Sequence, residues 1–492
     1  METGFRQFDL PGGARFFVRS TRQFKTVTVY AVWHHHLQRD RQGSRSLEDV
    51  QKEATQAALL PFLLKRGTKS YPETTALVAR LEELFGADLD VDVSKKGERQ
   101  LVRFRLEVAN PKFLPLRFRD ADRADGAAGR VGGPAGTRLL ADALSVLGEV
   151  LFAPATGNAD GLFRRDYFEQ ERDKLIRLLE SRVNDKVSYA TERCVEEMFV
   201  GEPFAIYRYG TVEALRVLDA REMTSFYRSF AATAPLDVFV VGDLDPQEAL
   251  RLVQETFLGP WQEASPRAGK ETFSKRVSAG SLPTPQAAPA ERGNPRAVEE
   301  TLDVSQAKVS LGFLTGIGYQ SPDTTALSVY GGILGGGPHS KLFQNVREKA
   351  SLAYYVFARL ERFKGIMVIG AGIESANYDK ARDIIDEQLE AIRAGRISDY
   401  EYDATIKAMV NAIRVSQDSP GGPVEILLDG LVGGAVREPE EIIRRVESVT
   451  KEEVAAVAAR VVPDATFFLH GKPGSARPAA EVAVPEGGEA GV

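Results

Sequence analysis

The sequence predicts an α+β protein built from two similar lobes, each a largely antiparallel sheet packed with helices. Two observations support this fold class. The order of strand-like and helical segments in the first half of the chain recurs in the second half, and each half closes on an apolar strand that ends in glycine. Helix pairs packed on antiparallel strands, present twice, are typical of a duplicated α+β architecture.

In the first half, apolar patterns predict a strand, two helices, two further strands and a closing strand. Alternating or continuous apolar runs indicate the strands, and apolar residues at helical spacing indicate the helices. Gly86 directly follows the second helix, as expected at a helix C-terminus. The expected strands are 26–33, 89–93, 101–108 and 236–242, and the expected helices are 54–66 and 77–85.

The second half shows the same order of elements. The expected strands are 308–314, 353–360, 365–372 and 466–471, and the expected helices are 322–334 and 340–349. Because the order of element types matches the first half, we expect the second lobe to have the same topology as the first.

We expect the first lobe to cover residues 1–261 and the second lobe residues 299–473. The residues between them, 262–298, are rich in proline, alanine, glycine and charge, which indicates an extended linker on which the lobes hinge. The low-complexity run 119–136 is expected to be a surface insertion, and residues 474–492 are expected to form a disordered tail.

The composition argues against several classes of function. With 492 residues, 43% hydrophobic and 27% charged, the chain fits a soluble globular protein. A net charge of −6 argues against nucleic-acid and membrane binding, since both favour a basic surface. Cys194 is the single cysteine, which excludes an intrachain disulfide and fits a reducing compartment. No apolar run approaches the ~18–20 residues of a membrane span, and the first residues lack a secretory apolar stretch, so a cytoplasmic protein is expected.

The segment 54–75, ATQAALLPFLLKRGTKSYPETT, is the most informative part of the first half. An apolar helix leads into the turn Arg66-Gly67-Thr68 and then into a Ser-Tyr-Pro segment. This frame resembles the inverzincins, the zinc-peptidase family of pitrilysin, insulin-degrading enzyme and mitochondrial processing peptidase. In that family the helix carries H-x-x-E-H just before the Gly-Thr pair. Two histidines there bind zinc, and the glutamate activates water.

The zinc motif itself is missing from this chain. Aligned on the Gly-Thr pair, the two histidine positions are Ala58 and Phe62, and the glutamate position is Pro61. None of these residues can bind a metal or move a proton, so the resemblance implies a degenerate zinc site with no metal and no cofactor. Glu180 is the candidate for the family's third ligand, although the insertion leaves its register open. One carboxylate alone does not hold zinc.

A second likeness to the family lies in the C-terminal half. A glycine-rich run at 330–337 is followed by S-x-L-F from Ser340, R-E-K from Arg347 and L-A-Y ending at Tyr354. In the family the arginine and the tyrosine face the zinc site and are proposed to bind the peptide carbonyl or the oxyanion. The resemblance implies this role for Arg347 and Tyr354, because fixed donors aimed at developing negative charge lower the barrier. Without the surrounding pattern, they would be a helix-end cation and a strand aromatic.

The glycine-rich turn is the second candidate for substrate contact. Its spacing is not that of a phosphate-binding loop, so a hinge or a close backbone approach is the better interpretation. In the non-catalytic subunit of processing peptidases such a turn is linked to substrate handling. The resemblance therefore implies a substrate-binding set made of Gly335, Gly336, Gly337, His339 and Ser340.

Other candidates have simpler interpretations. Three adjacent histidines, 34–36, follow a strand, and neighbours on an extended chain point to alternate faces, so they rarely converge on one ion. We expect a surface loop there rather than a metal site. The acidic runs Glu169–Glu171 and Glu196-Glu197 are expected to be solvated helix faces. His470 is expected to be structural.

These residues favour a non-catalytic, substrate-binding subunit of a heterodimeric zinc metallopeptidase. Family members without the zinc motif usually act beside a partner that keeps it, and bacterial pairs divide H-x-x-E-H and the Arg/Tyr pair between two subunits. The expected partners are a zinc-bearing homologous subunit and a peptide or unfolded protein, with no independent activity. Within the family the chain is most similar to the bacterial YfmF-type subgroup. A catalytically inert scaffold or peptide-binding protein, and a hydrolase with another site, remain open alternatives.

Overall fold

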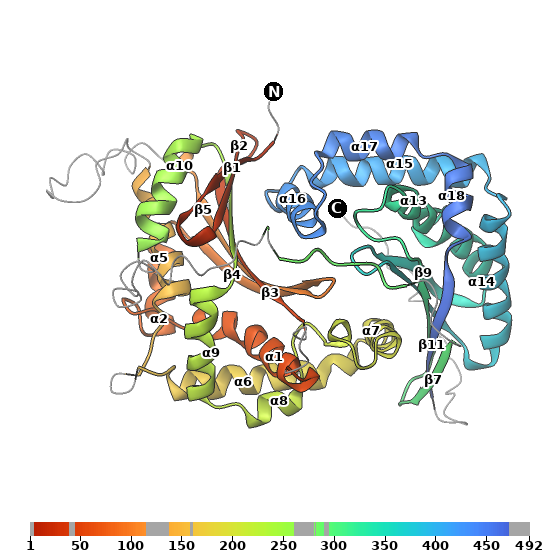
Figure 1. The fold of residues 1–492 in the computed structure, drawn as a ribbon, viewed down its shortest axis with the longest axis horizontal. Helices are drawn as coiled ribbons and strands as arrows, with labels where there is room; N and C mark the ends of the chain where they lie inside the picture. Colours follow the sequence, from red (N-terminus) through yellow and green to blue (C-terminus); the bar gives the residue numbers. More distant parts are fainter. Residues whose placement is uncertain are drawn as a thin grey trace, which may run out of the picture.

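A computed structural model describes residues 4–38, 45–114, 137–157, 161–259, 280, 282–289 and 295–471. Two lobes lie side by side, the N-terminal lobe in red to green and the C-terminal lobe in green to blue (Figure 1). The expected insertion at 119–136 and the expected tail at 474–492 lie outside the described residues, as does most of the expected linker.

The N-terminal lobe combines one sheet with a layer of helices and short helical turns. Its strands are β1 (Arg6–Asp9), β2 (Arg15–Ser20), β3 (Thr26–His36), β4 (Asp88–Lys96), β5 (Arg99–Ala109) and β6 (Leu236–Gly242). Its α-helices are α1 (Leu47–Leu64), α2 (Thr74–Glu83), α5 (Thr137–Phe152), α6 (Arg165–Glu180), α7 (Lys186–Met198), α8 (Val212–Val217), α9 (Ala220–Thr233) and α10 (Pro246–Leu252). Its 3-10 turns are η1 (Pro11–Gly13), η2 (Pro111–Phe113), η3 (Ser181–Asn184) and η4 (Pro203–Ala205), and η5 (Val253–Phe257) is a π-helix.

The C-terminal lobe repeats this plan with one strand fewer in its sheet. Its strands are β7 (Arg296–Thr301), β8 (Ala307–Leu314), β9 (Ala353–Glu361), β10 (Ile366–Ile373) and β11 (Val462–His470). Its α-helices are α13 (Thr324–Gly335), α14 (Tyr378–Arg393), α15 (Asp399–Ser416), α16 (Gly421–Gly433), α17 (Pro439–Ser448) and α18 (Lys451–Ala458). Between them lie the π-helix η7 (Phe343–Lys349) and the 3-10 turn η8 (Ser375–Asn377).

The two sheets have equivalent strand orders. The N-terminal sheet runs β1-β2-β6-β3-β5-β4 and the C-terminal sheet runs β7-β11-β8-β10-β9. In each, one parallel pair (β2 with β6, β7 with β11) joins an otherwise antiparallel sheet. The expected α+β fold of two homologous, largely antiparallel lobes is therefore confirmed.

Several elements differ from the sequence-based expectation. Helix α1 begins at Leu47 rather than near residue 54, because Ser46 and Asp49 form a capping box at its start. Strand β3 continues to His36 instead of ending at Trp33, since its last residues still pair with β5. The edge strands β1 and β7 and the short strand β2 carry no long apolar run and were not anticipated. Strand β7 begins inside the segment expected to be a linker.

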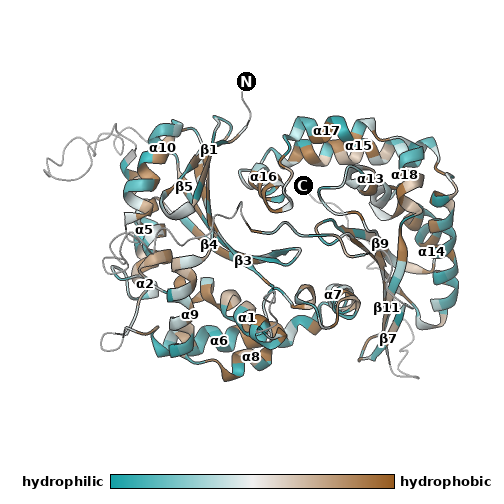
Figure 2. Cartoon of the chain, in the orientation of Figure 1, coloured by the Kyte–Doolittle hydropathy of each residue, from teal (hydrophilic) through white to brown (hydrophobic). Residues whose placement is uncertain are grey.

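Each lobe contributes a helix to the other lobe's sheet. Helix α7 precedes β6 in the chain, yet it packs on β8, β10 and β11 of the C-terminal sheet, where Cys194 and Met198 are buried (Figure 1). Helix α16 in turn places Val424 and Leu428 against the N-terminal sheet. Figure 2 shows hydrophobic residues on both helices and on the strands around them. Separating the lobes would expose two apolar clusters, so these helices hold the lobes together.

The described part of the expected linker is bonded to both lobes. Nη2 of Arg99 in the N-terminal lobe donates to the carbonyl oxygen of Pro283 (2.9 Å). The backbone N–H of Ala288 donates to the carbonyl oxygen of Lys364 in the C-terminal lobe (2.7 Å). The idea of a freely hinging linker finds no support in residues 282–289, because they bridge two lobes that α7 and α16 already join.

Candidate functional site

Helix α1 carries the positions that the resemblance assigns to the zinc motif, and its side chains there are apolar. Ala58 is fully buried, Pro61 is buried and Phe62 is half-buried. The ring of Phe62 packs 6.4 Å from the ring of Tyr209. The described residues contain no group of three or more histidine, cysteine, aspartate or glutamate side chains that could hold a metal ion. The motif positions of α1 therefore belong to the packed interior.

The turn after α1 has a structural reason for its Gly-Thr sequence. A Cβ atom on Gly67 would lie 2.6 Å from the carbonyl oxygen of Pro72, too close for any side chain. Oγ1 of Thr68 donates to the carboxylate of Glu149 (2.8 Å), and the N–H of Thr68 donates to the carbonyl oxygen of Tyr71 (2.9 Å). Glycine thus permits the close backbone approach, and threonine ties the turn to α5.

Helix α6 carries the acidic residues considered for the third ligand position. Glu171 is only 7% exposed, and its Oε1 lies 2.6 Å from Nζ of Lys174 and 3.4 Å from Nη1 of Arg66. The expectation of a solvated helix face is therefore wrong for Glu171, because α6 packs on α1 and buries it. Glu180 is exposed at the end of α6, where it accepts a hydrogen bond from Arg216 (3.1 Å).

The three adjacent histidines lie in β3, so the expectation of a surface loop is wrong. Nε2 of His34 lies 3.0 Å from Oδ2 of Asp237, and burial lowers the pKa of His34. Nδ1 of His35 lies 2.9 Å from Oε1 of Gln100, and burial lowers the pKa of His35 to about 4. The strand's alternation sends the two rings to different partners, as expected for an extended chain. They are neutral groups of the interior and form no metal site.

Arg347 and Tyr354 lie on adjacent segments at the surface of the C-terminal lobe. Arg347 is in the last turn of η7 with 42% of its side chain exposed, and Tyr354 in β9 is 67% exposed. The guanidinium of Arg347 lies 4.6 Å over the ring of Phe343, and its nearest carboxylate oxygen, on Glu348, is 3.9 Å away. Within the described residues neither side chain makes a hydrogen bond. Both are therefore free to donate to another molecule.

The backbone between the two residues is unusual. A π-helix of this length is rare, and such helices concentrate at functional sites. Ser351 has a φ of 52°, a left-handed conformation that non-glycine residues seldom adopt. The N–H of Leu352 donates to the carbonyl oxygen of Val346 (3.0 Å), which brings the start of β9 back beside η7. This turn places Arg347 and Tyr354 on neighbouring elements.

The structure divides the expected substrate-binding set into an exposed and a buried part. Gly336 is exposed, while Gly337 and His339 are half-buried. Gly335 is buried, and a Cβ atom there would lie 2.3 Å from the backbone nitrogen of Ala358 in β9. Nε2 of His339 lies 2.9 Å from Oγ1 of a threonine on α15. Ser340 is fully buried, so neither it nor Gly335 can touch a substrate in this conformation.

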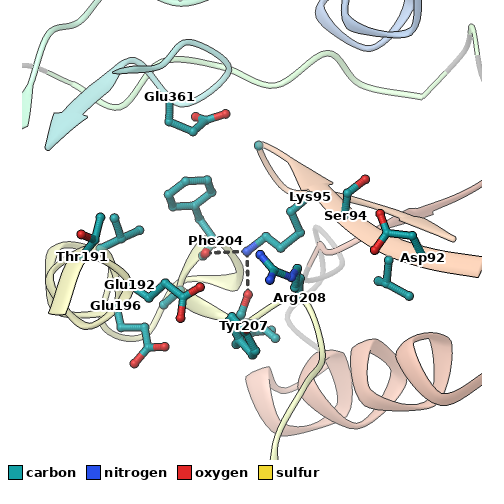
Figure 3. A pocket seen from close by; sticks show the side chains of 15 residues that line it. Asp92, Ser94, Lys95, Thr191, Glu192, Glu196, Phe204, Tyr207, Arg208 and Glu361 are labelled. Atoms are coloured by element: carbon teal, nitrogen blue, oxygen red, sulfur yellow. Dashed lines mark hydrogen bonds between the residues drawn. The ribbon is translucent and has the colours of Figure 1, made fainter. Parts of the chain in front are cut away.

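A cavity of about 530 Å³ lies where the two lobes meet, and sequence reasoning gave no sign of it (Figure 3). It is lined by β4, α7, the η4 loop and the end of β9. Nζ of Lys95 lies at its centre and donates to the carbonyl oxygens of Phe204 (2.7 Å) and Ile206 (2.6 Å). Burial lowers the pKa of Lys95 to about 8. The cavity adjoins the zinc helix, since Tyr209, which contacts Phe62, follows the η4 loop directly.

Four acidic residues, Asp92, Glu192, Glu196 and Glu361, also line the cavity. Glu192 and Glu196 on α7 lie 2.5 and 2.7 Å from the guanidinium of Arg182. Glu196 is thus a half-buried, paired group, which corrects its interpretation as part of a solvated helix face. Burial raises the pKa of Glu361 at the end of β9, although backbone N–H groups donate to its carboxylate. Strand β4 pairs with β5 alone in the described sheet, so its outer edge offers backbone groups to an extended peptide.

These features define a class of protein: a two-lobed α+β scaffold whose positions 58, 61 and 62 on α1 carry no zinc ligand. Residues 218–409 match the family described as Peptidase M16 inactive domain. The chain is 32% identical over 465 residues to "Probable inactive metalloprotease YmfF" of Bacillus subtilis, an alignment that covers 94% of this chain and 97% of that protein. The chain therefore belongs to the M16 peptidase family. The resemblance to this peptidase family is therefore confirmed.

Two further similarities extend this result. A solved structure described as a conserved protein from Enterococcus faecalis V583 has a TM-score of 0.79 and 29% identity, covering 95% of this chain and 99% of that one. An uncharacterized zinc protease of Mycobacterium bovis is 26% identical over 61% of this chain and 66% of its own length. Among the described residues, no helix is both long and apolar enough to cross a membrane.

Proposed function

We propose that this chain is the non-catalytic, substrate-binding subunit of a heterodimeric zinc metallopeptidase. A homologous partner supplies the zinc ion, the water and the base. This chain supplies Arg347 and Tyr354 as donors to the peptide carbonyl and the oxyanion in the partner's zinc site. The single cysteine makes the cytoplasm the proposed compartment.

The observation that carries the proposal is the distance, within one chain, between the exposed Arg347/Tyr354 pair and the inter-lobe cavity. Tyr354 and Glu361 lie at opposite ends of β9, and seven residues at roughly 3.4 Å each separate them by about 24 Å. Glu361 lines the cavity next to α1, whereas Arg347 and Tyr354 lie at the far end of the strand. The exposed donors therefore lie away from the part of the inter-lobe cavity that Glu361 lines, and their exposure makes them available to a second subunit.

The chemistry of the two residues supports the assignment. Peptide hydrolysis places negative charge on the former carbonyl oxygen, and donors fixed before the reaction stabilise that charge best. A guanidinium offers several oriented N–H groups, and a phenol offers one short O–H donor. Neither residue holds a structural hydrogen bond within the described residues that this role would break.

The test uses this chain together with a homologous subunit that carries an intact H-x-x-E-H motif. We expect Arg347→Ala or Tyr354→Phe to lower the kcat of the complex by roughly 10²–10³-fold, the effect of one lost oxyanion donor. The loss falls on kcat rather than KM, because the contact strengthens only as charge develops. Arg347→Lys rescues poorly, since a point charge does not reproduce the planar guanidinium.

Two matched variants control for general effects. Arg359→Ala removes another exposed arginine of β9, and Tyr400→Phe removes the hydroxyl of another exposed tyrosine. Both are expected to leave kcat, zinc content and assembly unchanged. If Arg347→Ala and Tyr354→Phe assemble with an intact partner and cleave at the wild-type rate, the chain is a scaffold or peptide-binding protein without a part in hydrolysis.

A further inference from the structure

A second cavity, of about 420 Å³, lies inside the C-terminal lobe and is separate from the inter-lobe cavity. Helices α13, α15, α16 and α17 and the end of β9 surround it, in the upper right of Figure 1. Cavities of this size in globular proteins commonly accommodate small ligands. Neither the degenerate zinc helix nor the Arg347/Tyr354 pair takes part in its lining.

One wall of this cavity is apolar. On α13, two glycines stand where a side chain would not fit. A Cβ atom on Gly331 would lie 2.8 Å from Leu360, and one on Gly332 would lie 2.5 Å from Thr405. The helix therefore approaches β9 and α15 closely, and at the two glycines the wall consists of backbone and hydrocarbon. Nearer the start of α13, Thr324, Thr325 and Ser328 add hydroxyl groups to the lining. Met409 and Ile413 extend the same surface along α15. A hydrocarbon chain placed here would leave water for an apolar wall, which is favourable.

The other side of the cavity carries three arginines and one aspartate. Asp429 lies 2.5 Å from Nζ of Lys96 and 3.3 Å from Nη2 of Arg362, so it is already neutralised. Arg445 lies 2.9 Å from a glutamate of its own helix, α17. Arg437 has no ion pair within the described residues, and its guanidinium lies 5.9 Å over the ring of Tyr319. The cavity thus has a cationic side with one guanidinium left for a ligand.

We propose that this cavity binds an apolar carboxylate, with the head group on Arg437 and the hydrocarbon against the glycine wall of α13. A guanidinium matches a carboxylate through two parallel hydrogen bonds, which favours this head group over a neutral one. The excess of arginine over aspartate disfavours a cationic ligand. This inference does not depend on the proposed role of the Arg347/Tyr354 pair.

Two sources share this chemistry: a free medium-chain acid and the carboxyl terminus of a peptide that ends in leucine. Octanoate and a short peptide ending in Leu-Leu are the probes, measured by isothermal titration calorimetry on the full chain. Octanol and the C-terminal amide of the same peptide are the matched neutral probes. We expect saturable binding of at least one carboxylate and no saturable binding of the neutral probes. The carboxylate that binds more tightly identifies the source.

Two variants test the assignment to this cavity. Arg437→Ala is expected to weaken binding roughly 10- to 100-fold, the effect of losing a hydrogen bond to a charged group. Ala412→Trp, on an exposed lining position of α15, is expected to block the cavity without disturbing the core. Arg444→Ala, an exposed arginine of α17 outside the lining, is the control and should bind as the wild type does. Absence of saturable carboxylate binding, or wild-type binding by both lining variants, would overturn the proposal.

Discussion

The connection from β3 to β4 and the connection from β8 to β9 take the same topological place in the two lobes, but their side chains are arranged in opposite ways. In the first, Ala58 and Pro61 of α1 are buried against the core. In the second, Arg347 and Tyr354 are exposed and make no hydrogen bond within the described residues. Polar groups that are exposed and unpaired contribute little to stability. The difference indicates that the first connection serves packing and the second is available for binding.

Two charged residues, Asp237 in the N-terminal lobe and Arg347 in the C-terminal lobe, show a similar contrast. Asp237 in β6 is fully buried, accepts two hydrogen bonds from Arg15 (2.8 and 2.7 Å) and lies 3.0 Å from His34. Although burial alone would raise the pKa of Asp237, contact with His34 and Arg15 holds it below its ordinary value. The charge of Asp237 in the N-terminal lobe is therefore internal and paired, whereas that of Arg347 in the C-terminal lobe faces solvent.

The largest expected loss of stability follows from removing the buried carboxylate of Asp237. Asp237→Ala leaves the guanidinium of Arg15 buried without its partner, so we expect the free energy of unfolding to fall by about 3–5 kcal/mol. Urea denaturation of the purified chain measures it. Asp90→Ala, at an exposed aspartate of β4, is the control and should change stability by less than about 0.5 kcal/mol. Equal, small effects of both variants would break the contrast between internal and exposed charge.

The next expected effect is on stability and activity when zinc-binding residues are introduced at positions 58, 61 and 62. We expect the triple variant Ala58→His, Pro61→Glu, Phe62→His to lose stability, with Phe62→His alone costing on the order of 1–3 kcal/mol. No zinc-dependent peptidase activity should appear, because zinc ligands need supporting hydrogen bonds and Glu171 is held by Arg66 and Lys174. Metal analysis and a peptide-cleavage assay measure both outcomes. Robust activity of the triple variant would show that α1 still has the surroundings of a catalytic site.

The next prediction is that stability depends on pH through Lys95 in the inter-lobe cavity. The folded-state pKa of Lys95, about 8, lies below its ordinary value of 10.5, so the unfolded chain binds more protons between these values. Stability should therefore rise with pH from about 8 to 10.5, by up to about 1.4 kcal/mol per pH unit relative to Lys95→Met. Below pH 8 the difference between the two proteins should be constant. If the wild type and Lys95→Met show parallel stability profiles from below pH 8 to pH 10.5, the amine of Lys95 is not buried in the folded protein.

The smallest expected effect is on the stability of the exposed pair. Arg347→Ala and Tyr354→Phe should each change the free energy of unfolding by less than about 0.5 kcal/mol, since neither side chain is buried or hydrogen-bonded within the described residues. Thermal and urea unfolding of the isolated chain measure this. A loss above about 2 kcal/mol would mean that the pair supports the fold, and its effect on kcat would then need another explanation.

The sequence by itself determined the fold class, the duplicated order of elements and the lack of zinc ligands at positions 58, 61 and 62. These features are local, because apolar spacing sets each strand or helix and a motif is read within a few neighbouring residues. The motif that contains Arg347 and Tyr354 was visible in the sequence. The structure shows in addition that both side chains are exposed.

Only the tertiary structure decided how the lobes are joined and where the cavities lie. His34 and Asp237 meet across 203 positions of the chain, so nothing near His34 in the sequence signalled its burial. The exchange of α7 and α16 and the cavity around Lys95 likewise combine segments from both halves. The physical reason is that a residue's burial and pairing depend on which distant surfaces pack against it, and a local pattern carries no record of those partners.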